Sequence, residues 1–267
     1  MTAQLVLVGG GNMGAALLGG MIAAGWAAPD QLAVVEVLPD RRAALAAQFP
    51  GVQVSDSAGA VPAAGAVIAV KPNDVAAAVA AAVAAGARRV LSVAAGVSIA
   101  ALEAAAAGAT DDRVAVVRAM PNTPALVGEG AAAIAGGTVA DEHDLAWAEG
   151  ILGAVGTVVR VPEYQLDAVT GLAGSGPAYL FLVAESLVDA GVLAGLARPV
   201  AQALVTQLFV GSSALLAERG DPAALRAMVT SPGGTTAAGL RQLESHGVRS
   251  AFLDAVMAAT QRSRELG

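Results

Sequence analysis

The sequence lacks cysteine altogether, and aromatic side chains make up only 3% of its 267 residues. The absence of cysteine excludes disulfides, thiol nucleophiles and thiolate metal sites. The scarcity of aromatic side chains argues against a surface on which the bases of a nucleic acid could stack. The formal net charge of −7 points the same way, because it would repel a polyanion. We therefore expect no nucleic-acid partner.

Charged residues are also scarce, at 14% of the chain, whereas apolar residues reach 56%. The first 29 residues carry no charge, but they have no basic segment of the kind that opens a signal peptide, and glycines interrupt them. Residues 199–217 form a second uncharged run, which contains Gln202, Gln207, Ser212 and Ser213. Because these polar side chains suit a buried helix of a soluble bundle better than a bilayer, we expect no membrane span and a cytoplasmic protein.

The chain has only two histidines, His143 and His246, and both lie in polar segments typical of a protein surface. The run "DEHD" at 141–144 could suggest a metal site. It fits the exposed start of a helix better, because carboxylates are stabilised near the positive end of the helix dipole. We expect no metal.

The first 162 residues alternate short apolar runs with helix-like segments. The runs typical of strands lie at 4–9, 31–37, 66–70, 88–93, 113–119 and 156–161. Strands that are apolar on both faces indicate a parallel sheet covered by helices on both sides. We predict an α/β domain with a doubly wound sheet over residues 1–162.

After Pro162 no strand pattern is convincing, and long helical segments follow, separated by glycines and prolines. They span roughly 175–194, 198–219, 221–229, 235–246 and 248–265. Ser175 is predicted to be the N-cap of the first, with Pro177 in its first turn. We predict an all-helical domain over residues 163–267.

The run "GGGNMG" follows the first predicted strand and opens the first predicted helix. It places Gly9, Gly11 and Gly14 in the G-x-G-x-x-G pattern of dinucleotide-binding Rossmann-type domains. Gly9 permits a tight turn, Gly11 permits close approach of a diphosphate, and Gly14 permits close packing of helix and strand. The backbone around Asn12 and Met13 then offers free N–H groups to the phosphates. A tight turn without a ligand is the alternative.

Glu36 ends the second predicted strand, where an acidic residue can accept hydrogen bonds from the ribose hydroxyls of NAD. A carboxylate there repels the 2′-phosphate of NADP, so the cofactor is NADH or NADPH with NADH favoured. Arg41 and Arg42 complicate this preference, because they open the next helix and carry positive charge. Their directions differ on a helix, so we expect at most one of them to reach the site.

Two further motifs follow predicted strands, at the edge of the sheet where ligands bind. "AVKP" supplies Val70, Lys71 and Pro72 as candidate cofactor contacts, and "RAMPNTPALVGEG" supplies Asn122. A solvated loop for Lys71 and a rigid connector capped by Asn122 are the alternatives.

At this point the chain resembles a known family, pyrroline-5-carboxylate reductase. "GGGNMG", "AVKP", "SVAAGV", "RAMPNTPALV", "GSGPAY" and "TSPGGTT" occur in the order and spacing of that family, across nearly the whole chain. The resemblance implies reduction of the cyclic imine 1-pyrroline-5-carboxylate to L-proline with NAD(P)H, the last step of proline synthesis. It also implies a Rossmann domain, a helical dimerisation domain and an active site to which a partner subunit contributes helices.

The run "TSPGGTT", residues 230–236, precedes a predicted helix, so its backbone can bind an anion. Given the resemblance, that anion is the carboxylate of the imine. Residues that are expected to bind the substrate are Ser231, Gly233, Gly234, Thr235 and Thr236. Thr236 is the candidate catalytic residue, because the resemblance places its hydroxyl at the ring nitrogen; a helix-capping hydroxyl is the alternative.

The sequence departs from the family pattern at three positions. Ala173 stands where the family often has serine, Ala227 where it often has an acidic residue, and Glu36 where Asn, Ser or Thr is common. Roles from the first two positions therefore do not transfer.

Three other functions were considered. A β-hydroxyacid dehydrogenase is disfavoured, because it would need a lysine on the helix entering the second domain, and residues 163–197 contain none. A reductase of a related cyclic imino acid and a non-catalytic dinucleotide-binding sensor remain as alternatives.

The uncharged helix predicted at 199–217 bears on assembly. A helix that is apolar all round must be buried, and one short helical domain offers few partners for it. We expect a dimer at least, and the resemblance allows a ring of dimers.

Overall fold

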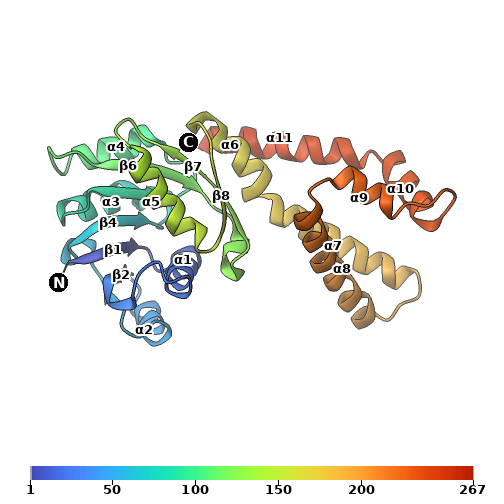
Figure 1. The fold of residues 1–267 in the computed structure, drawn as a ribbon, viewed down its shortest axis with the longest axis horizontal. Coiled ribbons are helices and arrows are strands. Elements are labelled where there is room, and N and C mark those ends of the chain that lie inside the picture. Colours follow the sequence, from blue (N-terminus) through green and yellow to red (C-terminus); the bar gives the residue numbers. More distant parts are fainter. Residues whose placement is uncertain (1, 267) are drawn as a thin grey trace. The chain divides into compact units, whose positions relative to one another are not determined.

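The computed structural model describes residues 2–266, which form two compact units (Figure 1). The first unit runs up to Ser175 and includes the residues from Ala258 onward, and the second comprises Gly176–Met257. The boundary between these units does not coincide with the domain boundary predicted after residue 162. That domain boundary stays a prediction.

The first unit contains an eight-stranded sheet in the order β3-β2-β1-β4-β5-β6-β7-β8. The strands are β1 (Ala3–Val8), β2 (Leu32–Val35), β3 (Gln53–Ser55), β4 (Ala63–Ile68), β5 (Arg89–Ser92), β6 (Ala115–Met120), β7 (Gly130–Gly136) and β8 (Gly156–Arg160). The first six are mutually parallel, whereas β7 pairs antiparallel with β6 and parallel with β8. The predicted class, a Rossmann-type sheet followed by helices, is confirmed.

Two buried cores cover the two faces of this sheet. In β1, Val6 and Val8 belong to one core, and Leu5 and Leu7 belong to the other. This alternation follows from the two-residue period of a strand. The first core packs on α3 (Val75–Ala84) and α4 (Ile99–Ala107), and the second on α1 (Asn12–Ala23), α2 (Pro39–Gln48) and α5 (Glu142–Gly153). Helices on both faces explain why the strands read as apolar throughout.

Two strands of the sheet were not predicted. β7 has the sequence GAAAIAG, which contains one β-branched residue and no aromatic one. Its propensity for strand is therefore weak, and its pairing between β6 and β8 fixes it instead. β3 is a three-residue strand at the other edge.

Short 3₁₀ turns connect several elements, namely η1 (Pro29–Gln31), η2 (Ala58–Ala60), η3 (Pro72–Asp74), η4 (Thr123–Val127) and η5 (Glu163–Gln165). After η5 the chain continues as α6 (Leu166–Val169), the π-helical turn η6 (Thr170–Gly174) and α7 (Gly176–Leu193). Ser175 has helical dihedral angles between η6 and α7. The predicted N-cap role of Ser175 is therefore wrong, because the helical path begins before it.

The second unit is helical. It contains α7, α8 (Arg198–Arg219), α9 (Pro222–Met228), α10 (Thr235–Ser245) and the start of α11 (Val248–Leu266), whose last residues belong to the first unit. A pair of helices, Glu163–Leu193 and Arg198–Arg219, is long and apolar enough to cross a membrane by length and composition alone.

The apolar surface of α7 and α8 is largely open to solvent in one chain. Ala201 is the one buried residue of α8, and Val188 is that of α7. This exposure in one chain agrees with the expectation that one short helical domain offers few partners for residues 199–217, and their burial in a bundle stays a prediction. A single chain offers too few neighbouring helices to cover this surface.

Candidate active site

The glycine-rich turn joins β1 to α1. Gly9 has a φ of 108°, and a Cβ on it would stand 2.5 Å from the carbonyl oxygen of Ala69, just after β4. A Cβ on Gly14 would collide with the carbonyl oxygen of Gly9. Both positions require glycine because the turn, the start of the helix and the end of β4 come into contact.

Gly11 differs from its neighbours, because no heavy atom lies within 4 Å of where its Cβ would stand. It is the N-cap of α1, and no side chain caps that helix. The first N–H groups of α1, from Asn12 and Met13 onward, therefore face open space without a side-chain acceptor. This arrangement fits the diphosphate of a dinucleotide, which takes up free N–H groups at a helix N-terminus.

Glu36 lies beside this turn. Its Oε2 accepts a hydrogen bond from Gly10 N at 3.2 Å, and its Oε1 accepts one from Leu38 N at 3.0 Å. These two bonds hold the carboxylate at the end of β2, next to the glycine-rich turn.

Both arginines of α2 reach the same loops. Arg41 Nε donates to Gly10 O at 2.7 Å, and Arg42 donates to the carbonyl oxygens of Glu36 and Val37 at 2.9 and 2.8 Å. The two side chains approach different carbonyls of adjacent loops, and the expectation that at most one of them reaches the cofactor site stays a prediction.

The other half of the edge carries a cavity of about 560 Å³. Its lining includes Lys71, Asn73, Gly96, Thr170, Ser175 and Arg262. Lys71 and Pro72 follow β4, and Val70 packs partly against the first core. The sequence did not predict that Ser175 or α11 would line this cavity. α11 is far along the chain from the other lining residues, and Ser263 on α11 reaches Asp167, 96 residues earlier, through a 2.7 Å hydrogen bond.

Asn122 uses both ends of its amide on the main chain. Its Nδ2 donates to Ala173 O in the π-helical turn at 3.1 Å, and its Oδ1 accepts from Ala131 N in β7 at 2.8 Å. Asn122 thus links two segments, but its side chain does not cap the turn that follows it.

The loop 230–236 lies in the second unit, before α10. Gly233 has a φ of 69°, and Gly234 is the N-cap of α10, which no side chain caps. The Ser231 hydroxyl stands where a Cβ of Gly234 would be. One hydroxyl and an uncapped helix N-terminus thus lie together, an arrangement suited to a small carboxylate.

Thr235 and Thr236 are the first two residues of α10. Thr235 is exposed, whereas Thr236 is half-buried. The structure thus brings all five predicted substrate-binding residues into one loop and helix start, in the second unit, and the predicted cofactor residues into the first.

Charged networks in the first unit lie away from its glycine-rich turn. Asp144 is buried and pairs with Arg89, the first residue of β5, at 2.8 Å and with Arg113, two residues before β6, at 3.0 Å. Hydrogen bonds from Arg160 hold the pKa values of Glu142 and Glu149 below their usual range. These groups tie together the sheet edge opposite the glycine-rich turn.

The "DEHD" segment starts α5, and Asp141 caps that helix by accepting from His143 N and Asp144 N. No group of three or more His, Asp and Glu side chains within residues 2–266 is placed to hold a metal ion.

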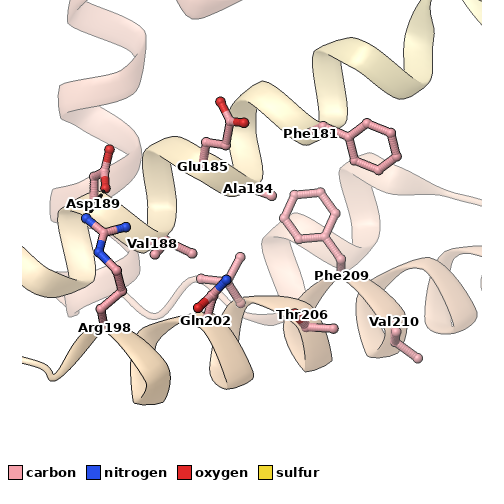
Figure 2. Close-up of a pocket in the computed structure, with 11 residues that line it drawn as sticks. Phe181, Ala184, Glu185, Val188, Asp189, Arg198, Gln202, Thr206, Phe209 and Val210 are labelled. Atoms are coloured by element: carbon pink, nitrogen blue, oxygen red, sulfur yellow. Dashed lines mark hydrogen bonds and ion pairs between the residues drawn. The ribbon is translucent and has the colours of Figure 1, made fainter.

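A groove of about 620 Å³ lies between α7 and α8 and is lined by residues of both helices. Figure 2 shows Phe181 and Phe209 towards one end and Asp189 with Arg198 at the other, where Arg198 pairs with Asp189 at 2.8 Å. The groove is mainly apolar, and Leu204 and Leu208 elsewhere on α8 are 58% and 53% exposed. Such a surface is typical of a site of protein association.

The comparisons with known proteins cover both halves of the chain. Residues 163–266 match the family model for pyrroline-5-carboxylate reductase dimerisation, and residues 4–96 match that for NADP oxidoreductase, coenzyme F420-dependent. A pyrroline-5-carboxylate reductase of Synechocystis is 46% identical over 100% of this chain and 99% of its own length.

Solved structures agree. A pyrroline-5-carboxylate reductase from Coxiella burnetii has a TM-score of 0.91 at 33% identity, covering 100% of this chain and 99% of that one. A pyrroline carboxylate reductase from Plasmodium falciparum, solved with NADP bound, has a TM-score of 0.84 at 29% identity, covering 99% and 98%. The chain belongs to the pyrroline-5-carboxylate reductase family. Its helical region carries the dimerisation domain of that family, so self-association is supported.

Proposed function

We propose that this protein reduces 1-pyrroline-5-carboxylate to L-proline with NAD(P)H, the last step of proline biosynthesis. The observation that carries the proposal is the 46% identity, over the whole chain, to a relative named pyrroline-5-carboxylate reductase. The substrate loop adds support, because an uncapped helix start next to Ser231 suits the one carboxylate of the imine.

In the proposed reaction, the bound reduced nicotinamide supplies a hydride to the imine carbon, and the ring nitrogen of the product keeps its proton. The backbone at Gly233 and Gly234 binds the carboxylate, with Ser231 and Thr235 beside it. The Thr236 hydroxyl accepts a hydrogen bond from the protonated ring nitrogen and orients the imine. Because a protonated imine is already electrophilic, the contribution of these residues is mainly to hold it in a reactive position.

For the cofactor, we propose that Gly9, Gly11, Asn12, Met13 and Gly14 bind the diphosphate. Glu36 binds the adenosine ribose, and Val70, Lys71 and Pro72 line the path beyond it. Asn122 acts near the nicotinamide end. We propose that NADH is favoured, because the Glu36 carboxylate, which Gly10 N and Leu38 N hold beside the glycine-rich turn, would repel the 2′-phosphate of NADPH.

For assembly, we propose a dimer formed through α7 and α8, with rings of dimers as a larger form. We propose a cytoplasmic protein without a membrane or nucleic-acid partner.

Steady-state oxidation of NADH and NADPH with 1-pyrroline-5-carboxylate tests the proposal. Turnover with proline as product supports it. Turnover only with a six-membered cyclic imine would indicate a related imino acid reductase. Dinucleotide binding without any turnover would indicate a sensor.

A further inference from the structure

The path of a dinucleotide across the first unit can be followed from the strand order. Glu36 ends β2, the glycine-rich turn ends β1, and Lys71 and Gly96 follow β4 and β5. These strands are neighbours in the order β2-β1-β4-β5. With the adenosine at β2 and the diphosphate at β1, the nicotinamide half extends towards β4 and β5. The cavity of about 560 Å³ lies at that end.

The exposed lining of the cavity is mainly apolar, although Lys71, Asn73, Arg262 and Ser263 also border it. Ala95, Gly96, Ala259 and Leu266 contribute to its walls, and Thr170 and Ser175 bring hydroxyls from the π-helical turn. The Thr170 hydroxyl already donates to Leu166 O at 2.9 Å. Ser175 is half-buried, and it lines the cavity. A hydroxyl on an apolar wall suits a flat ring that carries a single amide.

The position of Ser175 depends on the π-helical turn. Ser175 N donates to Thr170 O at 2.8 Å, which closes that turn. Asn122 holds the turn from outside by its 3.1 Å bond to Ala173 O. The methyl group of Met120 stands 2.6 Å from where a Cβ on Gly174 would be. The segment after β6 therefore fixes the turn through a hydrogen bond and a packing contact.

We propose that Ser175 binds the carboxamide of the nicotinamide ring and that Asn122 is a positioning residue, which acts through the π-helical turn. The proposal rests on the proposed function, and it changes the role of Asn122 from contact with the cofactor to support of Ser175. π-helical turns inserted in α-helices often occur at functional sites, which agrees with this role.

The test compares two ligands by equilibrium binding to the full-length protein without substrate. NADH carries the carboxamide, whereas ADP-ribose contains the same adenosine, diphosphate and second ribose without it. Ser175→Ala is expected to weaken NADH binding about three- to tenfold, the effect of one lost hydrogen bond, and to leave ADP-ribose binding unchanged. Asn122→Ala is expected to show the same selectivity. Ser245→Ala is the matched control, because its hydroxyl bonds to Gln242 O and His246 Nδ1 at the end of α10, in the second unit.

The double variant tests the coupling. If Asn122 acts through Ser175, the double variant binds NADH about as weakly as the weaker single variant, because the two effects are not independent. Unchanged NADH binding by Ser175→Ala would overturn the proposal. Equal weakening of NADH and ADP-ribose, or full additivity of the two substitutions, would also overturn it. If the unaltered protein binds neither NADH nor NADPH, the proposed function itself fails, and the two failures are thereby distinguished.

Discussion

The hydroxyl of Ser231 occupies the space that a side chain on Gly234 would need. Gly234→Ala must therefore push the serine side chain away from the start of α10. We expect a raised KM for the imine and unchanged NADH binding in the absence of substrate. Gly239→Ala, in the same helix, is the control, because a Cβ at Gly239 would point into open space. It should raise stability by about 0.5 to 1 kcal/mol and leave the KM unchanged. Similar KM values for both variants would exclude this role for Ser231 and Gly234.

Thr236→Val should lower turnover about ten- to a hundredfold, because it removes one hydrogen bond to the charged ring nitrogen. NADH binding should stay as in the parent, and Thr236→Ser should restore most of the activity. The measurement is kcat and KM for the imine with each variant. An unchanged kcat/KM in folded Thr236→Val would remove this hydroxyl from the mechanism.

Glu36→Ser should improve kcat/KM for NADPH about tenfold or more. A unit charge beside the 2′-phosphate is worth about 1 to 4 kcal/mol, depending on its exposure to water. The parent should favour NADH. Arg41→Ala should reduce the use of NADPH more than that of NADH, because Arg41 lies against the same turn. A strong NADPH preference in the parent would mean that Arg41 and Arg42 dominate over Glu36.

Leu208→Glu should dissociate the dimer, because it places an unpaired charge on the apolar surface of α8. The Leu208 side chain on this surface is 53% exposed in one chain. Light scattering at micromolar concentration measures the mass, and activity should fall with dimer content. Glu218→Gln is the control at the end of α8, where Glu218 pairs with the adjacent Arg219. A fully active monomer of the parent would contradict the dimer.

The sequence allowed the glycine-rich turn and the loop 230–236 to be predicted because their signals are local. A strand, a glycine pattern and a helix start follow one another at Gly9 to Gly14, and the same holds for the glycines before α10. Features that depend on distant contacts could not be predicted this way. β7 is an alanine-rich strand fixed by its neighbours, and Ser175 entered the candidate site only through the strand order and the π-helical turn.

The helical region shows the same limit. Composition indicated that residues 199–217 must be covered, but it could not show which of their side chains one chain leaves exposed. Arg41 and Arg42 both reach backbone carbonyls, which depends on loop positions that helix geometry alone does not give.

The most direct test of the proposed reaction uses NADH that carries deuterium on the transferred position of the nicotinamide ring, together with 1-pyrroline-5-carboxylate. The account predicts that proline forms in equal amount to the NADH consumed and carries the deuterium on the former imine carbon, next to the ring nitrogen. Proline without the label, or NADH consumption without proline, would contradict direct hydride transfer to this imine.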